Sequence, residues 1–494
     1  MRIIKLAVAV LLLLSFESSG LYASGFESTG LGTTARGMGG AFRAVADDWS
    51  AAYYNPAGYA FIVDNQLGTS LGLIHYRHEI TPNYVATDDY GNDYGWGIAN
   101  GQEVYNFHRI LNNPSGGFVA RLPLWGETVF GLSAYQPFDN SLRWRLYAPD
   151  ASCMRAYNES AVGSREIPGH DYLIDLDVVA FQLTAAKEFN DEKIAVGIGL
   201  QLLRGDLWFS HLTFRQNPRG DDNPYVDERP FDRIPEFTDH QGSGWGFGLR
   251  AGMLWKATEK IDVAMTAYLP FDITVSGTTA YTFVMPGSEI LEGMVEANSA
   301  DYLFVSGDIL HMSSDFETKI QLPSSFGLGL AFRPNERLTV SLDAEYTLWS
   351  KYEGLQFSQT NFTNVPVFEQ DFFTTDLSNP VEWENSGKLA MGLRYELWPT
   401  LTLLAGGGAD QSPMRNSTEF TPQFMDLGTK KSYNGGAVLH INQWDIGLIT
   451  SYYSYPDVEF GSLTDLDSDN MFDNFPGAYK AVTYETVLSF GYRF

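Results

Sequence analysis

The residues that could form a catalytic site lack the spacing that such sites need. Gly68-Thr69-Ser70-Leu71-Gly72 matches the GxSxG pattern of a serine nucleophile, but it lies inside a predicted strand rather than at a strand-to-helix turn. The eight histidines show no metal-ligand spacing, and no HExxH motif occurs. Cys153 is the single cysteine, which excludes a disulfide framework, a thiolate zinc site and a CxxC redox pair. We expect no enzyme and no cofactor, with a lipase as a remote alternative.

Acidic side chains gather in two stretches that we expect to be solvated loops. The second stretch spaces its carboxylates like the first ligands of a calcium loop. However, Asn470 stands at the glycine position and Pro476 at the position of the final glutamate, so the motif is incomplete. The two groups are Asp221, Asp222, Asp227, Glu228, Asp232, Glu236 and Asp239, and Asp465, Asp467, Asp469 and Asp473.

Composition narrows the class of protein. The chain has 494 residues with 32 Lys and Arg against 60 Asp and Glu, a net charge of −28, which argues against a nucleic-acid partner. Aromatic residues make up 14% and charged residues 19%, which excludes a disordered chain. A mean hydropathy of −0.16 excludes a helical membrane bundle but not a membrane β-barrel, whose strands alternate apolar and polar residues.

The first 23 residues have the pattern of a cleaved signal peptide. Arg2 and Lys5 precede an apolar run from Leu6 to Leu14, and small residues follow up to Ala23. The run is too short to span a bilayer as an anchor. We therefore expect residues 1–23 to direct the protein out of the cytoplasm.

Strict alternation of apolar and polar residues predicts long β-strands. Between Val482 and Phe494, every second residue is apolar or aromatic, apart from Thr486, and Val487 is the only apolar residue on the opposite face. The same period recurs in 245–255 and 389–397. In a soluble sandwich the apolar face would form the core, whereas in an outer-membrane barrel it faces lipid. Arg250 and Arg394 fall on the polar face, where we expect them to pair with acidic side chains.

The lengths of the connections favour the barrel. Tight polar turns alternate with segments of about 20 to 35 residues, the order that short periplasmic turns and long external loops produce. We predict an all-β transmembrane antiparallel barrel of about 14 strands over 61–494, an even number as such barrels require. The expected strands are 67–80, 116–122, 127–146, 173–189, 193–214, 242–257, 260–283, 316–333, 337–357, 383–397, 400–410, 430–441, 443–459 and 482–494.

Residues 24–60 differ from the rest because they are rich in Gly and Ala and do not alternate. They include Gly37-Met38-Gly39-Gly40 and end with Asn55-Pro56-Ala57. Asp47 is placed to cap a short helix, and Pro56 must end one. The stretch resembles the start of the FadL/TodX (OmpP1) family of outer-membrane transporters for long-chain fatty acids and other hydrophobic compounds. The resemblance implies a small N-terminal helical hatch that plugs the lumen and ends at Asn55, Pro56 and Ala57.

Further landmarks follow in the order of that family, among them Tyr346-Thr347-Leu348-Trp349-Ser350 and Asp410-Gln411-Ser412-Pro413. The resemblance implies a bacterial outer-membrane protein surrounded by lipid and lipopolysaccharide. The terminal Phe494 resembles the signal that the barrel assembly machinery reads. The implied function is uptake of fatty acids or other hydrophobic molecules by capture at external loops, binding in the lumen and lateral release beside a kinked third strand.

The third predicted strand contains a proline at the place of the family's kink. Pro137 has no N–H group, so it must interrupt a ladder of hydrogen bonds in a closed barrel. Pro137, Phe138 and Asp139 are therefore the expected lateral gate. Family members often have Gly where Asp139 stands, and a harmless bend near the rim is the alternative.

Two groups of residues are expected to bind the ligand. Leu207, Phe209 and His211 share the inward face of the fifth strand above the bilayer, where a few polar groups in an apolar pocket would orient a fatty acid. The alternative for His211 is a solvated position at the base of a loop. Phe26 matches a hatch residue that the family places against the luminal ligand. The apolar loop 284–315 must pack on other loops, form a capture groove, or both.

A second function remains open within the same fold. Some FadL-like barrels, such as PorV, are docking or shuttle partners for secreted proteins, and they share the Gly-rich start. An apolar pocket open to a side gap would indicate transport, whereas a capped lumen with a flat outer surface would indicate docking.

Overall fold

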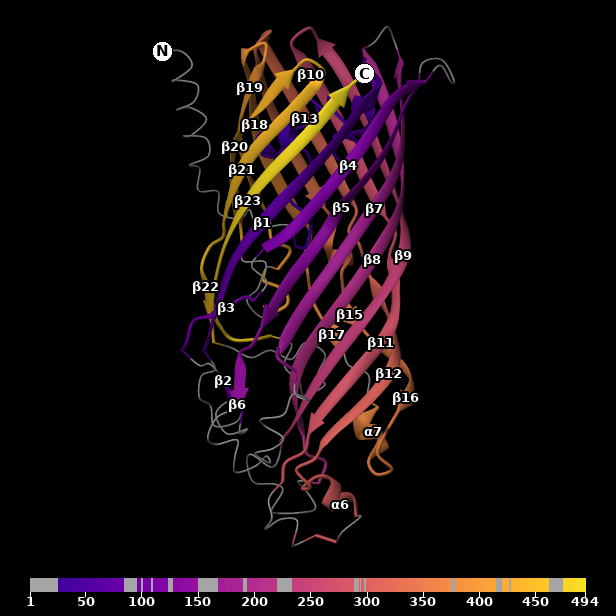
Figure 1. Ribbon diagram of the computed structural model, residues 1–494, viewed down its shortest axis with the longest axis vertical. Coiled ribbons are helices and arrows are strands. Elements are labelled where there is room, and N and C mark those ends of the chain that lie inside the picture. The colour runs from indigo at the N-terminus through magenta and orange to yellow at the C-terminus, as the bar shows by residue number, and fades with distance from the viewer. Residues whose placement is uncertain are drawn as a thin grey trace.

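The computed structural model is a closed antiparallel barrel of 14 wall strands, as the sequence predicts (Figure 1). It describes residues 25–494 apart from stretches within 84–109, 123–127, 150–167, 190–192, 220–232, 288–298, 375–377, 415–427 and 462–473. The predicted signal peptide and most residues of the two acidic stretches, including the incomplete calcium motif, lie outside the described residues. The wall strands are β1 (Gln66–Pro82), β4 (Ile110–Leu122), β5 (Thr128–Trp144), β7 (Tyr172–Phe189), β8 (Ile194–Gln216), β9 (Arg233–Thr258), β10 (Ile261–Pro270) continued by β11 (Ile273–Val284), β12 (Ile309–Ile320) continued by β13 (Ser325–Asn335), β14 (Leu338–Thr347), β18 (Ser386–Trp398), β19 (Leu401–Asp410), β20 (Lys430–Ile441), β21 (Trp444–Ser454) and β23 (Gly477–Arg493).

The barrel closes because its last strand pairs with its first. β23 pairs antiparallel with β1 from Gln66–Arg493 to Pro82–Gly477, and β1 pairs with β4 on its other side. The short turns and the C-terminus lie at one end of the barrel (Figure 1). The long connections leave the wall on the opposite side and contain the short strands β2 (Trp96–Ile98), β3 (Val104–Tyr105), β6 (Tyr147–Pro149), β15 (Gly354–Gln356), β16 (Ser358–Thr363), β17 (Ser378–Pro380) and β22 (Val458–Phe460) and the helices α6 (Ala300–Leu303), η3 (Trp349–Lys351) and α7 (Gln370–Phe373).

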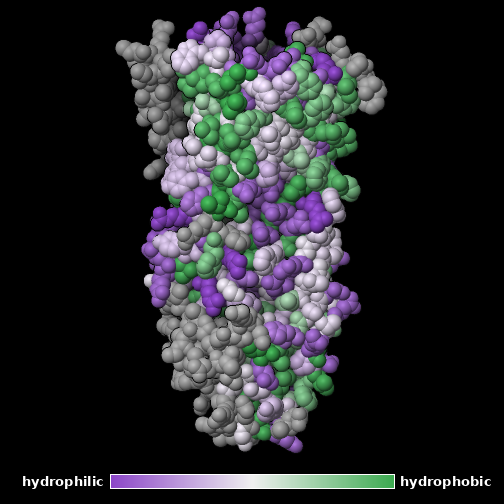
Figure 2. All heavy atoms as spheres, in the orientation of Figure 1, coloured by the Kyte–Doolittle hydropathy of each residue, from purple (hydrophilic) through white to green (hydrophobic). Residues whose placement is uncertain are grey.

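The alternation in the sequence separates a lipid face from a luminal face. On β23 the even-numbered residues from Tyr484 to Phe490 are exposed, and the odd-numbered residues from Thr483 to Ser489 are buried. Figure 2 shows the outward apolar residues as a green band in the half of the barrel nearest the short turns. This band matches the hydrocarbon core of a membrane, and the strands continue well beyond it.

Three strands differ from their predicted course. The seventh and eighth strands are each interrupted, so that pairing stops at Tyr268–Ser325 and resumes at Ile273–Ile320. A proline stands at each interruption, Pro270 and Pro323, and proline cannot donate to a ladder. The predicted strand 337–357 leaves the wall after Thr347, and its continuation through η3 and β15 turns into the lumen.

The N-terminal segment, residues 25–62, lies inside the barrel. Its elements are α2 (Thr33–Gly37), α3 (Ala51–Tyr54) and η1 (Pro56–Phe61), and most of its side chains are buried. α2 contacts β19, β20 and β21, whereas η1 contacts β7, β8 and β9, so the segment crosses the lumen from wall to wall. None of the described helices is long and apolar enough to cross a membrane.

The predicted cap at Asp47 is wrong. The N-cap of α3 is Ser50, whose backbone N–H and hydroxyl both donate to the Asp48 carboxylate, at 2.8 and 2.6 Å. Asp47 instead accepts from Arg394 of the wall at 2.6 Å. α3 ends at Tyr54, and Pro56 then opens η1, where the missing N–H of proline costs nothing.

Candidate functional site

The wall has a gap between β4 and β5. The described ladder between these strands ends at the pair Gly116–Ala134, although β4 continues to pair with β1 as far as Ile110. At the external end, Arg143 of β5 joins residues 106 and 107: the Arg143 N–H donates to the Asn106 side chain at 2.9 Å, and the Phe107 N–H donates to the Arg143 carbonyl at 2.9 Å. The wall gap is therefore bounded at both ends, and Tyr135–Leu142 form one of its edges.

Pro137, Phe138 and Asp139 lie on that edge. The register between β5 and β7 shifts between Tyr135 and Phe138, which leaves Gln136 and Pro137 as a bulge. Because Pro137 has no N–H group, it cannot donate to a neighbouring strand. The structure thus places the three predicted gate residues where the wall is interrupted.

The start of the N-terminal segment seals the wall gap from inside. The Ser28 N–H donates to the Pro137 carbonyl at 3.0 Å, and the Asp139 N–H donates to the Phe26 carbonyl at 3.0 Å. On the other edge, the Asn113 side chain of β4 donates to the Ser28 hydroxyl at 3.0 Å. Three hydrogen bonds thus place residues 26–28 between the two edges like a short additional strand.

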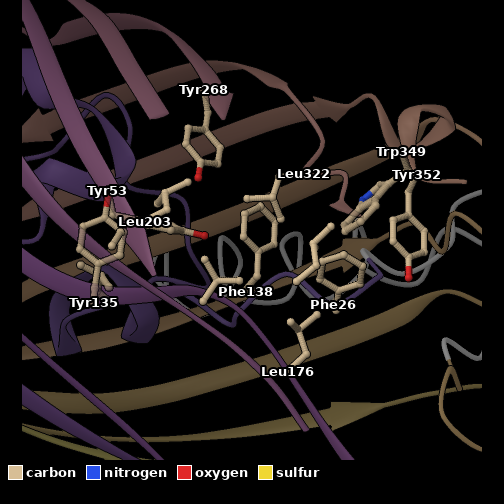
Figure 3. Packing of buried hydrophobic residues seen from close by; sticks show 14 of the residues in the cluster. Phe26, Tyr53, Tyr135, Phe138, Leu176, Leu203, Tyr268, Leu322, Trp349 and Tyr352 are labelled. Atoms are coloured by element: carbon tan, nitrogen blue, oxygen red, sulfur yellow. The ribbon is translucent and has the colours of Figure 1, made fainter. Parts of the chain in front are cut away.

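Phe26 is the centre of an aromatic cluster beside this seal. Its ring centroid lies 4.8 Å from that of Trp349 and 5.3 Å from that of Tyr352, both on the segment that turns inward after β14. Phe138 lies between Phe26, at 5.8 Å, and Tyr268 of β10, at 6.2 Å (Figure 3). Aromatic rings therefore extend inside the barrel from the wall gap to Tyr268 of the interrupted strand β10.

A small cavity adjoins the seal. This gap pocket has a volume of about 80 Å³ and both aromatic and polar walls. Glu27 lies in it, and burial together with the nearby Glu345 carboxylate raises the Glu27 pKa from 4.5 to about 7. The lining comprises residues 25–27 and 29, Tyr76 and His78 of β1, Asp139, Asn140 and Leu142 of β5, Trp383, Phe424, Met425, Lys430, Tyr453, Tyr455 and Thr483.

The rest of the N-terminal segment is fixed to the wall by buried polar contacts. The Arg250 guanidinium donates to the Tyr53 carbonyl at 2.8 Å and stacks on the Tyr268 ring at 3.8 Å. Gln182 of β7 donates to the Ala52 carbonyl at 2.9 Å. Asn55, the first residue of the predicted hatch motif, donates to the Met253 carbonyl at 3.3 Å and accepts from the Ala57 N–H at 3.1 Å. Ion pairs complete the attachment: Arg36 with Glu485, Arg43 with Asp343 and Glu345, and Arg394 with Asp47.

The predicted upper group lies in a tightly packed region. Leu207, Phe209 and His211 are all buried, so the alternative of a solvated histidine is wrong. Phe209 stacks on Phe357 at 5.6 Å, and a nitrogen of the His211 ring lies 3.0 Å from the Thr238 hydroxyl. The structure brings Phe209 and His211 together but places Phe26 with the aromatic cluster at the wall gap.

Several residues of the site were not predicted. Ser28 and Asn113 complete the seal, and Trp349, Tyr352 and Trp383 surround Phe26. Trp349 lies in a stretch that the sequence marks as a family landmark, but nothing local to it indicates a contact with residue 26. Among the described residues, no three His, Cys, Asp or Glu side chains are grouped to hold a metal ion. Ser70 of the GxSxG pattern lies within β1, with its hydroxyl 2.8 Å from that of Ser115.

The family model and the relatives with similar sequences all describe outer membrane proteins. The family described as "Outer membrane protein transport protein (OMPP1/FadL/TodX)" matches residues 152–421. An outer membrane protein of Neisseria meningitidis serogroup B is 20% identical over 437 residues, which cover 87% of this chain and 85% of that protein. The 47 kDa outer membrane protein of Pasteurella multocida is 22% identical over 174 residues, 35% of each chain.

Solved structures share the fold over almost the whole chain. A Pseudomonas aeruginosa FadL homologue superposes with a TM-score of 0.70 at 18% identity, covering 95% of this chain and 99% of that one. The P. putida toluene transporter TodX superposes with a TM-score of 0.65 at 15% identity, covering 94% and 99%. At these identities, the likeness establishes the barrel architecture.

Proposed function

We propose a transport function for this chain, which belongs to the OMPP1/FadL/TodX family of outer membrane transport proteins and is a protein of the bacterial outer membrane. The family consists of transporters or channels rather than enzymes. In our proposal, the chain takes up fatty acids or other hydrophobic small molecules through external capture, luminal binding and lateral release. The observation that carries this proposal is the wall gap, against which residues 26–28 are held by hydrogen bonds and packing.

External capture fits the apolar surface at the far end of the barrel. The tip between β16 and α7 exposes Val367 and Phe368, with exposed fractions of 83% and 41%. Behind this tip, Phe304 of the predicted apolar loop packs on Phe373 of α7 with stacked rings at 6.0 Å. Exposed apolar groups in water attract a hydrophobic solute, since their contact removes apolar area from solvent.

Lateral release fits the way in which the N-terminal segment is held. Buried ion pairs and hydrogen bonds attach residues 36–57 to the wall, so this part acts as a fixed hatch that blocks the axial route. Residues 25–29 are the part whose displacement opens a path, because they lie against the edges of the wall gap. A solute released there enters the hydrocarbon region directly and never crosses the water-filled periplasmic mouth.

The outer surface fits insertion into an outer membrane. We propose that lipid and the apolar portion of lipopolysaccharide contact the exposed apolar band. We also propose that the barrel assembly machinery reads the C-terminal Phe494. Its ring is exposed and stacks on Phe118 of β4 at 6.2 Å, on the lipid side of the barrel.

The decisive test locks residues 26–28 in place. Ser28→Cys with Asn113→Cys, in a chain carrying Cys153→Ser, replaces two side chains that are hydrogen-bonded to each other at 3.0 Å with two neighbouring thiols. Ser70→Cys with Ser115→Cys is the matched control, since these hydroxyls are 2.8 Å apart within the intact β1–β4 ladder. Cells that lack their own transporter would be tested for uptake of labelled long-chain fatty acid and labelled hydrocarbon, with and without reductant.

We expect oxidation to stop uptake only in the Ser28/Asn113 pair and reductant to restore it. Pro137→Gly and Phe26→Ala, which alter the bulge and the seal, are expected to change uptake as well. Uptake that persists with a formed Ser28–Asn113 cross-link would exclude release through the wall gap. A folded, surface-exposed barrel with no uptake of any tested compound would favour the docking or shuttle role instead.

A further inference from the structure

The gap pocket contains buried polar atoms that the protein itself does not satisfy. Among the described residues, neither ring nitrogen of His78 has a hydrogen-bond partner, and the same holds for Thr483 Oγ1, Trp383 Nε1 and Glu27 Oε2. His78, Thr483 and Trp383 are only 7%, 2% and 4% exposed. Buried polar groups in folded proteins are nearly always paired. All four side chains line one cavity, so a polar molecule in that cavity, either water or a ligand that displaces it, can supply the partners.

The hydrogen-bonding capacity of these atoms restricts which functional group a bound ligand can carry. The indole N–H of Trp383 can only donate, a neutral His78 offers one donor and one acceptor, and the Thr483 hydroxyl can do both. The carboxylates of Glu27 and Asp139 accept when ionised. A hydroxyl group both donates and accepts, so it can pair with members of both kinds at once. A hydrocarbon would leave every one of these atoms unpaired, and a carboxylate could only accept.

The charges around the pocket also disfavour a ligand with a carboxylate group. Two carboxyl groups, those of Glu27 and Asp139, line the pocket. The Lys430 ammonium also lines it, but it shares the Asp410 carboxylate, 3.3 Å away, with the Lys388 ammonium at 3.7 Å, so Glu27, Asp139 and Asp410 together supply three carboxyl groups against these two ammonium groups. A ligand carboxylate would therefore enter an environment of its own sign, and like charges at short range in a poorly solvated cavity repel strongly.

The remaining walls suit an aromatic or alkyl body. Phe26 lies 5.9 Å from Trp383, and Trp383 lies 5.8 Å from Phe424. Flat apolar rings around a few polar groups are the usual make-up of a small-molecule site. The apolar part of a solute would extend from the pocket along this aromatic cluster.

We propose that the gap pocket selects neutral hydrophobic compounds that carry a hydroxyl group, such as alkylphenols, over the matching carboxylates and hydrocarbons. The inference rests on the proposed transport function and, of the hydrophobic small molecules considered there, favours hydroxyl compounds over fatty acids in their ionised form. His78, Thr483 and Trp383 pair with the hydroxyl, and Glu27 and Asp139 exclude anions.

Three matched probes test the inference: 4-propylphenol, propylbenzene and 4-propylbenzoate, titrated into the purified full-length protein in detergent by calorimetry at pH 7.5. The hydroxyl compound is expected to bind roughly tenfold more tightly than propylbenzene, the ratio that one additional satisfied hydrogen bond gives. The benzoate is expected to bind most weakly. Equal affinity for the phenol and the hydrocarbon, or tightest binding of the benzoate, would overturn the inference while leaving the transport proposal intact. Binding of none of the three would also overturn the inference, and the uptake experiment with the cross-linked variants would then decide the transport proposal separately.

Variants separate the two contributions. Thr483→Val and His78→Phe are expected to remove the preference for the phenol while retaining propylbenzene. Glu27→Gln combined with Asp139→Asn is expected to raise the affinity for 4-propylbenzoate at least tenfold relative to the hydrocarbon. Asp315→Asn, an exposed acid on the outer face of β12, is the control and should change neither ratio. An unchanged affinity of the Glu27→Gln/Asp139→Asn variant for 4-propylbenzoate would contradict the exclusion of anions by charge. If a variant does not fold, the comparison of the three probes on the unaltered protein decides the inference.

Discussion

Glu27 should make the seal of the wall gap depend on pH. Inside the barrel its pKa rises from 4.5 to about 7, mainly because burial disfavours the charged carboxylate and further because Glu345 lies nearby. A carboxyl group with a raised pKa binds its proton more tightly in the docked segment than in an undocked one. The docked state is therefore fully stable below pH 4.5 and loses stability as the pH rises towards 7.

The size of this effect follows from the shift. A difference of about 2.5 pKa units corresponds to at most roughly 3 kcal/mol. Between pH 5 and pH 8, the ratio of undocked to docked segment should rise by roughly ten- to seventyfold, with the upper value applying if the undocked carboxylate has its ordinary pKa. This is comparable to the three hydrogen bonds of the seal, each worth about 1 kcal/mol.

Amide hydrogen exchange measures this equilibrium directly. The N–H groups of Ser28 and Asp139 donate the two backbone hydrogen bonds of the seal, so their protection factors report on docking. We expect protection to fall from pH 5 to pH 8 after correction for intrinsic exchange. Glu27→Gln should give high protection at both values, because the amide has no charge to lose. Protection that is independent of pH in the unaltered chain, or equally dependent in Glu27→Gln, would refute the reasoning.

Three further predictions concern the stability of the barrel and its hatch. Arg36→Met should destabilise the protein by about 3–5 kcal/mol in denaturant titrations, because Glu485 is left buried without its cation, and adding Glu485→Met should recover much of the loss. Leu328→Arg, on the lipid face of β13, should cost about 2–4 kcal/mol on refolding into vesicles, whereas Leu328→Ala should cost much less. Gly39→Ala should lower the midpoint of thermal unfolding clearly more than Gly40→Ala does. Both glycines have a positive φ, but only at Gly39 would the new Cβ lie 2.5 Å from the Gly407 backbone nitrogen.

The wall was predictable because its signal is local. In an extended chain, alternate side chains must point to opposite faces, and lipid on one face imposes an apolar residue at every second position. The signal disappears where the strands extend beyond the membrane. β9 begins at Arg233 rather than at the predicted residue 242, because the alternation is lost there: residues 234–238 are buried at every position, and the outward Asp239 and Gln241 are polar.

The site was only partly predictable because its contacts join distant parts of the chain. Pro137 predicts an interruption of the strand ladder by itself, because proline has no N–H group to donate. The Pro137 carbonyl accepts a hydrogen bond from the backbone N–H of Ser28. Almost every residue type can make a backbone hydrogen bond, so the sequence does not indicate this contact. The surroundings of Leu207, Phe209 and His211 could not be predicted for a similar reason: Phe357, which stacks on Phe209, comes from the segment that turns inward after β14. Their role in ligand binding stays a prediction.

The contacts of the N-terminal segment also argue for the direction of movement. Displacing the whole segment along the barrel axis would break the buried pairs of Arg36 and Arg43, at about 3–5 kcal/mol for each cation removed from its partners. Displacing residues 26–28 alone breaks the three hydrogen bonds of the seal and the one that the Tyr53 hydroxyl donates to Glu27, about 1 kcal/mol each, and exposes Phe26, which adds about 2–3 kcal/mol. A hydrophobic ligand that packs against the aromatic cluster in place of Phe26 would offset most of that last cost, and no equivalent compensation exists for the buried cations. The sideways path is therefore the one that a bound ligand can itself open.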